Sequence, residues 1–222
     1  MAIVTITDQE KTLSLNAYVA FNIYAAHGDP DVSMFEPMQQ LQILQHRWQE
    51  RALSAVADRS VGVMLHGIVE EGAWELLQAI EDGDVDEQID AIGDIMIYSC
   101  AMCTQLRLDY MTLTNAFEVA NIEEPGDAFL LMVKTFGKLA HVIGKSRQKT
   151  RGYTDDGKVR EHAGAQLAAI AKCLNWMCFA NGWDAYALFD TTLKNVMQRD
   201  WTKNAVTGIE DVTQLELEIP VR

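Results

Sequence analysis

Four carboxylates, placed in pairs on two neighbouring segments, are the residues of this chain best suited to chemistry. Glu71 and Glu75 are four residues apart, and so are Asp90 and Asp94. Residues at that spacing share one face of a helix, with Cβ atoms about 5–6 Å apart. Asp94 interrupts the otherwise apolar run 92–97, where a carboxylate without a partner takes up a proton or binds a cation. Oxygen donors that converge from a helical hairpin suit Mg²⁺, so the sequence predicts a magnesium site here.

The segments around these acids have the apolar spacing and the end signals of helices. The predicted N-caps are Ser33, Ser60, Asp84 or Asp86, and Asp109, and Gly83 is predicted to end a helix. We expect helices over roughly 34–57, 60–83, 84–108, 109–121, 127–144, 159–181 and 184–201. Nothing between residues 34 and 204 has the alternation of a strand, so the predicted fold class is all-α, a helical bundle.

A weak internal repeat suggests how the chain is divided. Residues 108–113 (LDYMTL) resemble residues 183–188 (WDAYAL), and each follows a helix with a spaced cysteine pair. The halves 60–121 and 129–201 therefore look like one helical unit used twice, without the acids in the second copy. The expected organisation is an N-terminal extension (1–33), a catalytic unit (34–128), a degenerate second unit packed on it (129–204) and a tail (205–222).

Charge and composition limit the classes of partner. The chain of 222 residues has a net charge of −14, which argues against a nucleic-acid polymer because phosphate backbones need a basic surface. No window has the roughly 18 apolar residues that span a bilayer, and the N-terminus lacks the apolar core of a secretory signal. We expect a cytoplasmic protein with no membrane partner. Exposed apolar faces on a bundle of this kind favour self-association, so a homo-oligomer is expected.

The charges are unevenly distributed along the chain. Residues 67–127 contain fifteen acids and a single base, whereas residues 134–160 contain eight bases and two acids. One segment could hold a metal and the other a phosphate group. On charge alone, the favoured interpretation is that they are two solvated helical faces that attract each other.

The four cysteines are Cys100, Cys103, Cys173 and Cys178. The first two form a C-x-x-C, but within a helical apolar run and without a glycine knuckle. A zinc or redox pair is one interpretation, and small buried core residues in a reducing compartment is the favoured one.

The acidic segments 70–80 (EEGAWELLQAI) and 90–98 (DAIGDIMIY) resemble the MazG-like all-α nucleoside triphosphate pyrophosphohydrolases, a superfamily that includes the dimeric dUTPases. The family motif is E-E-x-x-E, then a dozen or more residues, then E-x-x-D. The resemblance covers residues 34–121 well and 129–201 loosely. It implies a bundle of MazG and dimeric-dUTPase type, with a tandem duplication whose second half is degenerate.

The resemblance also implies an activity and a set of site residues. The reaction would be attack of water on a nucleoside triphosphate to give (d)NMP and pyrophosphate, with Mg²⁺, or alternatively Mn²⁺, as cofactor. Glu71, Glu75, Asp90 and Asp94 would bind the metal, and Glu70 or Glu71 would activate the water. Lys145, Arg147, Lys149 and Arg151, in a predicted basic loop 145–158, would bind phosphate; a solvated loop is the alternative.

Recognition of the base would fall to residues of the helix 34–57 and to Asn121. Trp48 offers a stacking face, and Gln42, Gln45 or Asn121 could bind the edge of the base. For Trp48 the favoured interpretation is a core residue, and Asn121 is equally interpreted as a C-cap. His66, one turn before Glu70, is interpreted as a supporting or structural residue.

The chain departs from the family motif at two positions. The family's second Glu falls on Gly72 and its second-helix Glu falls on Ala91; in both places an acid lies one residue earlier, at Glu71 and Asp90. These departures support an alternative, a non-catalytic nucleotide-binding or scaffold protein that keeps the fold. A di-iron bundle is a weaker rival, because it needs Glu-x-x-His pairs and Glu161-His162 are adjacent.

Overall fold

The computed structural model describes residues 11–12, 15–18, 21–22, 33, 35–52, 60–115 and 125–199, and within these it is helical with no strand. The prediction of an all-α fold is confirmed. The helices are α2 (Pro37–Ala52), α3 (Val61–Glu70), η2 (Glu71–Glu75), α4 (Leu76–Asp82), α5 (Val85–Gln105), α6 (Tyr110–Asn115), α7 (Pro125–Arg147), α8 (Asp156–Asn181) and α9 (Ala185–Met197). None of these helices combines the length and apolar character needed to cross a bilayer.

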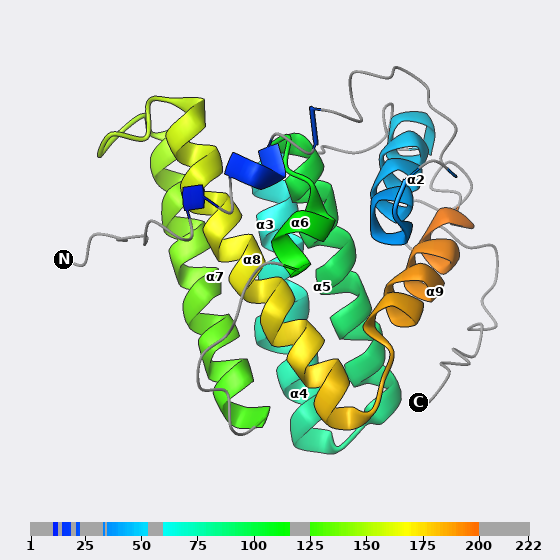
Figure 1. Cartoon of the computed structure of the whole chain (residues 1–222). Helices are drawn as coiled ribbons and strands as arrows, with labels where there is room; N and C mark the ends of the chain where they lie inside the picture. The colour runs from blue at the N-terminus through cyan, green and yellow to red at the C-terminus, as the bar shows by residue number, and fades with distance from the viewer. Residues whose placement is uncertain are drawn as a thin grey trace.

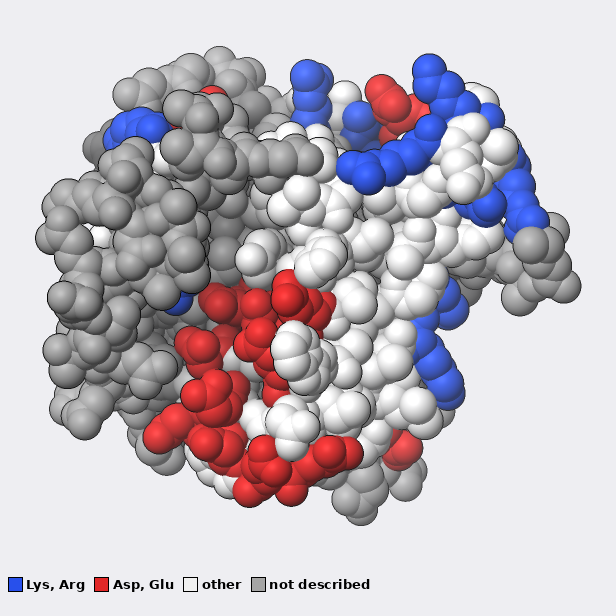
Figure 2. All heavy atoms as spheres, turned by 180° about the vertical axis from the view of Figure 1, so that it is seen from behind, with Lys and Arg blue, Asp and Glu red and all other residues white. Residues whose placement is uncertain are grey.

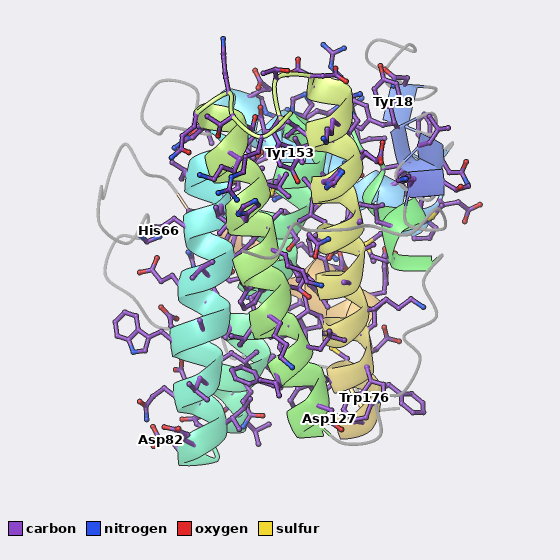
Figure 3. All side chains as sticks on the ribbon, turned by 90° about the vertical axis from the view of Figure 1, so that its left-hand side faces the viewer. Tyr18, His66, Asp82, Asp127, Tyr153 and Trp176 are labelled. Carbon is purple, nitrogen blue, oxygen red and sulfur yellow. The ribbon has the colours of Figure 1, made fainter. Side chains whose placement is uncertain are left out.

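Two long helical hairpins form the body of the structure (Figure 1). In the first, α3, η2 and α4 follow one another as one continuous rod that packs against α5. In the second, α7 packs along α8. The hairpins lie side by side through contacts of α3 with α7 and of α5 with α8, while α2 and α9 cover a further side of α5. Asp82 and Asp127 lie at one end of the hairpins and Tyr153 at the other (Figure 3).

Local chemistry sets the ends of these helices as the sequence predicts. Gly83 ends α4 in the left-handed conformation at φ 68°, and Asp84 Oδ1 then accepts hydrogen bonds from the N–H groups of Asp86 and Glu87 at 3.1 and 3.2 Å. Asp184 caps α9 in the same way. The predicted N-cap Asp84 is therefore confirmed, whereas Ser60 precedes α3 as predicted but makes no side-chain capping hydrogen bond to it.

The predicted basic loop 145–158 is wrong in its bounds. Helix α7 continues to Arg147, and α8 begins at Asp156, so the connection between them covers only residues 148–155. Asp155 accounts for the early start of α8, because its Oδ1 accepts the N–H of Gly157 at 3.0 Å. Residues 53–59 and 116–124, the first ten residues and the tail 205–222 lie outside the described residues.

A single hydrophobic core joins the two predicted units. The cluster includes Ile92 and Ile95 from α5, Leu139 from α7 and Leu167 from α8, all fully buried. The four cysteines are free and buried, and burial raises the pKa of the Cys100 and Cys103 thiols well above the usual range. The favoured interpretation of the cysteines, as core residues, is confirmed.

Gln42 ties α2 to the turn between α5 and α6. Its Nε2 donates to Thr104 Oγ1 at 3.1 Å and to the Leu108 carbonyl at 2.8 Å, and its Oε1 accepts the N–H of Tyr110 at 2.8 Å. Both amide hydrogens and the amide oxygen are thus engaged inside the fold. A buried backbone N–H or carbonyl group that loses such a partner lowers the free energy of unfolding.

We predict that Gln42→Ala lowers the free energy of unfolding by about 2–4 kcal/mol, because the Leu108 carbonyl and the Tyr110 N–H lose their partner. Urea denaturation measures the change. His46→Ala, on an exposed position of the same helix, is the matched control and should change stability little. Equal losses in the two variants would contradict this role of Gln42.

Candidate functional site

One turn of π-helix carries the first pair of acids. In η2 the N–H of Leu76 donates to the carbonyl of Glu71, five residues earlier. Such a turn inserts one extra residue into an α-helix, and π-turns occur often at functional sites. Glu71 is buried and Glu75 is exposed. The π-turn therefore spans the segment from Glu71 to Glu75, which contains both acids of the first pair.

Gly72, next to Glu71, lies where a side chain would clash with the neighbouring hairpin. A Cβ added at Gly72 would lie 2.4 Å from Cζ of Phe136, because the Phe136 ring of α7 packs directly on this backbone. The second hairpin therefore presses on the first at the position next to Glu71. Glu71 stands one residue earlier, where the helix faces α5.

The second pair of acids lies on one face of α5. Asp90, Asp94 and Tyr98 follow at intervals of four residues, so they line the same face of the helix. Next to Asp94, Gly93 allows α9 to approach closely: a Cβ there would lie 2.2 Å from Thr192 Oγ1. This contact brings the end of α9 to the acidic face of α5.

The four carboxylates lie close enough to perturb one another strongly. Burial, the charges of Asp94 and Glu75, a hydrogen bond with Glu75 and the charge of Asp90 raise the pKa of Glu71 to about 9. Burial and the charge of Asp90 raise the pKa of Asp94 to about 7, against an opposing effect of Arg199. Burial also raises the pKa of Asp90. We call these four residues the acidic cluster; without a cation it retains protons at neutral pH.

Arg199 and Tyr98 join the cluster although the sequence analysis assigned them no role. Arg199, just after α9, lowers the pKa of both Asp90 and Asp94. Burial and the neighbouring acids raise the pKa of Tyr98 to about 12, so its hydroxyl stays a hydrogen-bond donor. The spacing of four residues between Asp94 and Tyr98 could have identified Tyr98 from the sequence. No local pattern in the sequence connects Arg199 with residues so far away in the chain.

Glu70, the other predicted catalytic acid, lies at the edge of the acidic cluster. Its Oε2 is 3.1 Å from Nδ1 of His66, one turn earlier on α3, and both side chains are substantially exposed. Glu70 contributes to the raised pKa of Tyr98, which places it within electrostatic reach of the cluster. The interpretation of His66 as a supporting residue agrees with this contact.

The structure does not bring the predicted phosphate-binding residues to the acidic cluster. Lys145, Arg147, Lys149 and Arg151 lie where α7 ends and the connection to α8 begins, and Arg147 contacts Ser60 at the start of α3. Glu71 follows the other end of α3, about 15 Å away along a helix of that length. Figure 2 shows the acidic and basic groups on separate parts of one face, with uncharged surface between them.

The predicted base-binding residues that the structure describes are all buried in the fold. Gln42 is occupied inside the fold, as described above, and therefore does not face a ligand. Trp48 is buried. Gln45 donates to the Ile97 carbonyl at 2.8 Å, while its buried Oε1 accepts no hydrogen bond. Asn121 lies outside the described residues.

The donor set of the acidic cluster suits a hard cation, although its arrangement is not that of a finished metal site. Among the described residues, no group of three or more His, Cys, Asp or Glu side chains is placed to hold a metal ion as it stands. Like charges repel, so carboxylates without a cation move apart as far as their packing allows. What suits a hard cation is therefore the chemistry of the donors. The cluster offers four carboxylates, and their negative charge exceeds the positive charge of the one neighbouring arginine.

We predict that the metal-free protein is less stable at pH 9 than at pH 6. The folded pKa values of Asp94 (about 7) and Glu71 (about 9) exceed those of the unfolded chain, so the folded state holds more protons. This contribution to stability is complete below the ordinary carboxylate range and is lost as pH rises through 7 and 9. With allowance for solvent screening we expect about 2 kcal/mol, or roughly 4–8 °C in Tm.

Thermal unfolding in EDTA buffers at the two pH values measures this difference. Glu71→Gln, which cannot ionise, should lose most of the pH dependence. Glu81→Gln, an exposed acid of α4, should retain it. A wild-type Tm that stays constant from pH 6 to 9 would show that the folded protein does not retain protons on Asp94 and Glu71 in this range.

No protein-family model, curated protein or solved structure matches this chain, so a function has to be argued from the acidic cluster itself.

Proposed function

We propose that this protein is a Mg²⁺-dependent nucleoside triphosphate pyrophosphohydrolase, which converts a (d)NTP and water to the (d)NMP and pyrophosphate. The observation that carries the proposal is the proximity of Glu71, Glu75, Asp90 and Asp94 on η2 and α5, which together with burial raises the pKa of Glu71 to about 9 and that of Asp94 to about 7. Such perturbed acids are typical of functional sites. The resemblance of residues 70–80 and 90–98 to the MazG-like motif supplies the reaction.

The chain's own residues would divide the work at this site. Glu75, Asp90 and Asp94 would hold the metal, with Glu71 as a fourth ligand or as the group beside it. Mg²⁺, or Mn²⁺ in its place, supplies charge neutralisation on the phosphate oxygens and lowers the pKa of a bound water. These carboxylates would hold the cation on the side of the hairpin where Tyr98 and Arg199 also lie.

Glu71 is a better candidate for the general base than Glu70. Its carboxylate lies within the acidic cluster, whereas that of Glu70 is engaged with His66 at the edge. A nearby cation favours the ionised form of Glu71, which can then accept a proton from water. Glu70 would act on the site only from its edge, through its charge near Tyr98.

Arg199 replaces the predicted residues Lys145, Arg147, Lys149 and Arg151 as the proposed phosphate ligand. It is the basic residue of the described chain that lowers the pKa values of Asp90 and Asp94, so it lies where a metal-bound phosphate would arrive. A guanidinium group forms two parallel hydrogen bonds to a phosphate. The neutral Tyr98 hydroxyl offers a further donor on the same face of α5.

A non-catalytic binding or scaffold protein is the second candidate. It is favoured by Gly72 and Ala91, which stand where the family has acids, and by the lack of a ready-made metal site among the described residues. Homo-oligomerisation, in either case, stays a prediction. Exposed large apolar side chains such as Trp74 and Phe179, 64% and 73% exposed, are available for it.

We predict that Mg²⁺ binding at pH 7 releases protons, because a cation forces Glu71 and Asp94 to ionise. Calorimetric titrations with Mg²⁺, in two buffers of different ionisation enthalpy, measure the number released. Glu71→Gln should release fewer protons than wild type. Binding that releases no protons would place the cation away from these two residues.

We further predict that the full chain releases pyrophosphate and nucleoside monophosphate in equal amounts from at least one nucleotide of a dNTP and NTP panel with Mg²⁺. Glu75→Gln and Asp94→Asn should each lower kcat about 100-fold or more, since a metal ion contributes several kcal/mol of transition-state stabilisation. Arg199→Gln should mainly raise KM for the triphosphate.

Glu81→Gln serves as the control for these charge changes, because Glu81 is exposed on α4 and should leave the rate unchanged. Pyrophosphate release is followed colorimetrically after conversion to phosphate. Binding of a nucleotide without pyrophosphate from any member of the panel would favour the scaffold candidate.

A further inference from the structure

A second, basic pocket lies at the end of the bundle away from the acidic cluster. It has a volume of about 510 Å³ and lies where α3 and α8 begin and where α5 and α7 end. Arg107, Arg147 and Arg160 line it, with Asp156 as the acid. We propose that this pocket binds a small phosphate monoester, with the phosphoryl group at the arginines and the organic part against the apolar wall. The proposal is independent of the proposed pyrophosphohydrolase activity.

The charge of the pocket is unusual for this protein. The whole chain carries 32 acids against 18 lysines and arginines, yet three arginines line this one space. Among the described residues, no ion pair joins Arg107, Arg147 or Arg160 to a carboxylate. Their positive charge is therefore available to an anion, and the planar fork of arginine matches a phosphoryl group.

Arg147 is held against the positive end of a helix. Its Nη2 donates to Ser60 Oγ at 3.1 Å, and its guanidinium lies so close to Gly62 that a Cβ there would be 2.2 Å from Nη2. Ser60 makes no side-chain capping bond to the first turn of α3. The N-terminal end of a helix carries partial positive charge, so a cation next to it is unfavourable unless an anion accompanies both.

Arg160 is fixed on the opposite wall. Its Nε donates to the Leu106 carbonyl at 2.8 Å, and its guanidinium stacks on the Tyr18 ring with Cζ 4.0 Å from the ring centre (Tyr18 is labelled in Figure 3). These contacts use one edge and one face of the group. They leave the terminal nitrogens, in a fixed orientation, without hydrogen-bond partners in the described part of the chain.

Arg107 stands at a position that favours glycine. The turn after α5 and the turn after α8 share one hydrogen-bond pattern, in which Leu108 N–H donates to the Cys103 carbonyl and Trp183 N–H to the Cys178 carbonyl. The left-handed residue of the second turn is Gly182, with φ 74°, but that of the first is Arg107, with φ 57°. A residue with a Cβ is strained in this conformation, so the arginine is retained at a cost to the fold.

The remaining walls indicate that the ligand has an organic part. Val61, Leu106, Ile143 and Val159 supply apolar surface beside the arginines. The volume lies within the roughly 300–1,000 Å³ of small-molecule sites and exceeds what a phosphate ion alone would fill. A phosphate monoester with a compact apolar or aromatic group satisfies both the charge and the walls.

Calorimetric titration of the full chain with phenyl phosphate, in low-salt buffer containing EDTA, tests the proposal. Phenyl phosphate is neither substrate nor product of the proposed hydrolase, so binding does not depend on that activity. Arg107→Gly and Arg147→Gln should each raise Kd about tenfold or more. Arg107→Gly places the favoured residue in its turn and should remain folded, which circular dichroism checks.

Lys138→Gln is the matched control, because Lys138 is an exposed base of the same helix α7 outside the pocket. It should leave Kd unchanged, as should Asp94→Asn in the acidic cluster. Absence of saturable binding, or equal weakening by Lys138→Gln, would overturn the proposal. So would loss of binding in Asp94→Asn. Inorganic phosphate should bind more weakly than phenyl phosphate; equal affinity would overturn the assignment of an organic part.

Discussion

Repulsion between carboxylates that the packing holds together is the constraint on which this structure depends. Phe136 presses on Gly72 and Thr192 presses on Gly93, so the helices that carry Glu71 and Asp94 cannot move far apart. Burial then raises the pKa values of both acids. Replacing buried ionisable groups with apolar residues is often neutral or stabilising, so these acids do not favour the stability of the fold. The proposed cation would relieve the repulsion between them.

The second hairpin supports the first without sharing its chemistry. Helices α7 and α8 contribute apolar contacts to the common core, including the Phe136 ring that fixes the π-turn beside Glu71. The repeat seen in the sequence corresponds to one turn built twice, with the same hydrogen bond of 2.8 Å from Leu108 to Cys103 and from Trp183 to Cys178. The two turns differ in the residue at the left-handed position, where function and backbone preference compete.

Features governed by neighbouring residues could be predicted from the sequence, whereas those governed by packing could not. Gly83, Asp84 and Asp184 act within one turn of the chain, so their spacing alone located helix ends. The paired acids were visible because helical periodicity places residues four apart on one face. The π-turn depends on how Phe136 meets Gly72, and Arg199 reaches the acids only through the packing of α9 on α5. The basic residues of 145–151 were predicted beside the acids because composition shows that opposite charges exist but not at which end of a bundle each one lies.

The separation of charge along the bundle has a consequence for which phosphates each end can accept. A free phosphate ester that approaches the acidic cluster meets four carboxylates and a single arginine, so it is repelled unless a divalent cation arrives with it. At the opposite end Arg107, Arg147 and Arg160 face one carboxylate, and an anion can enter without a metal. Under the two proposals, a magnesium-bound triphosphate would therefore bind at η2 and α5, and a metal-free monoester would bind in the arginine pocket at the other end of α3.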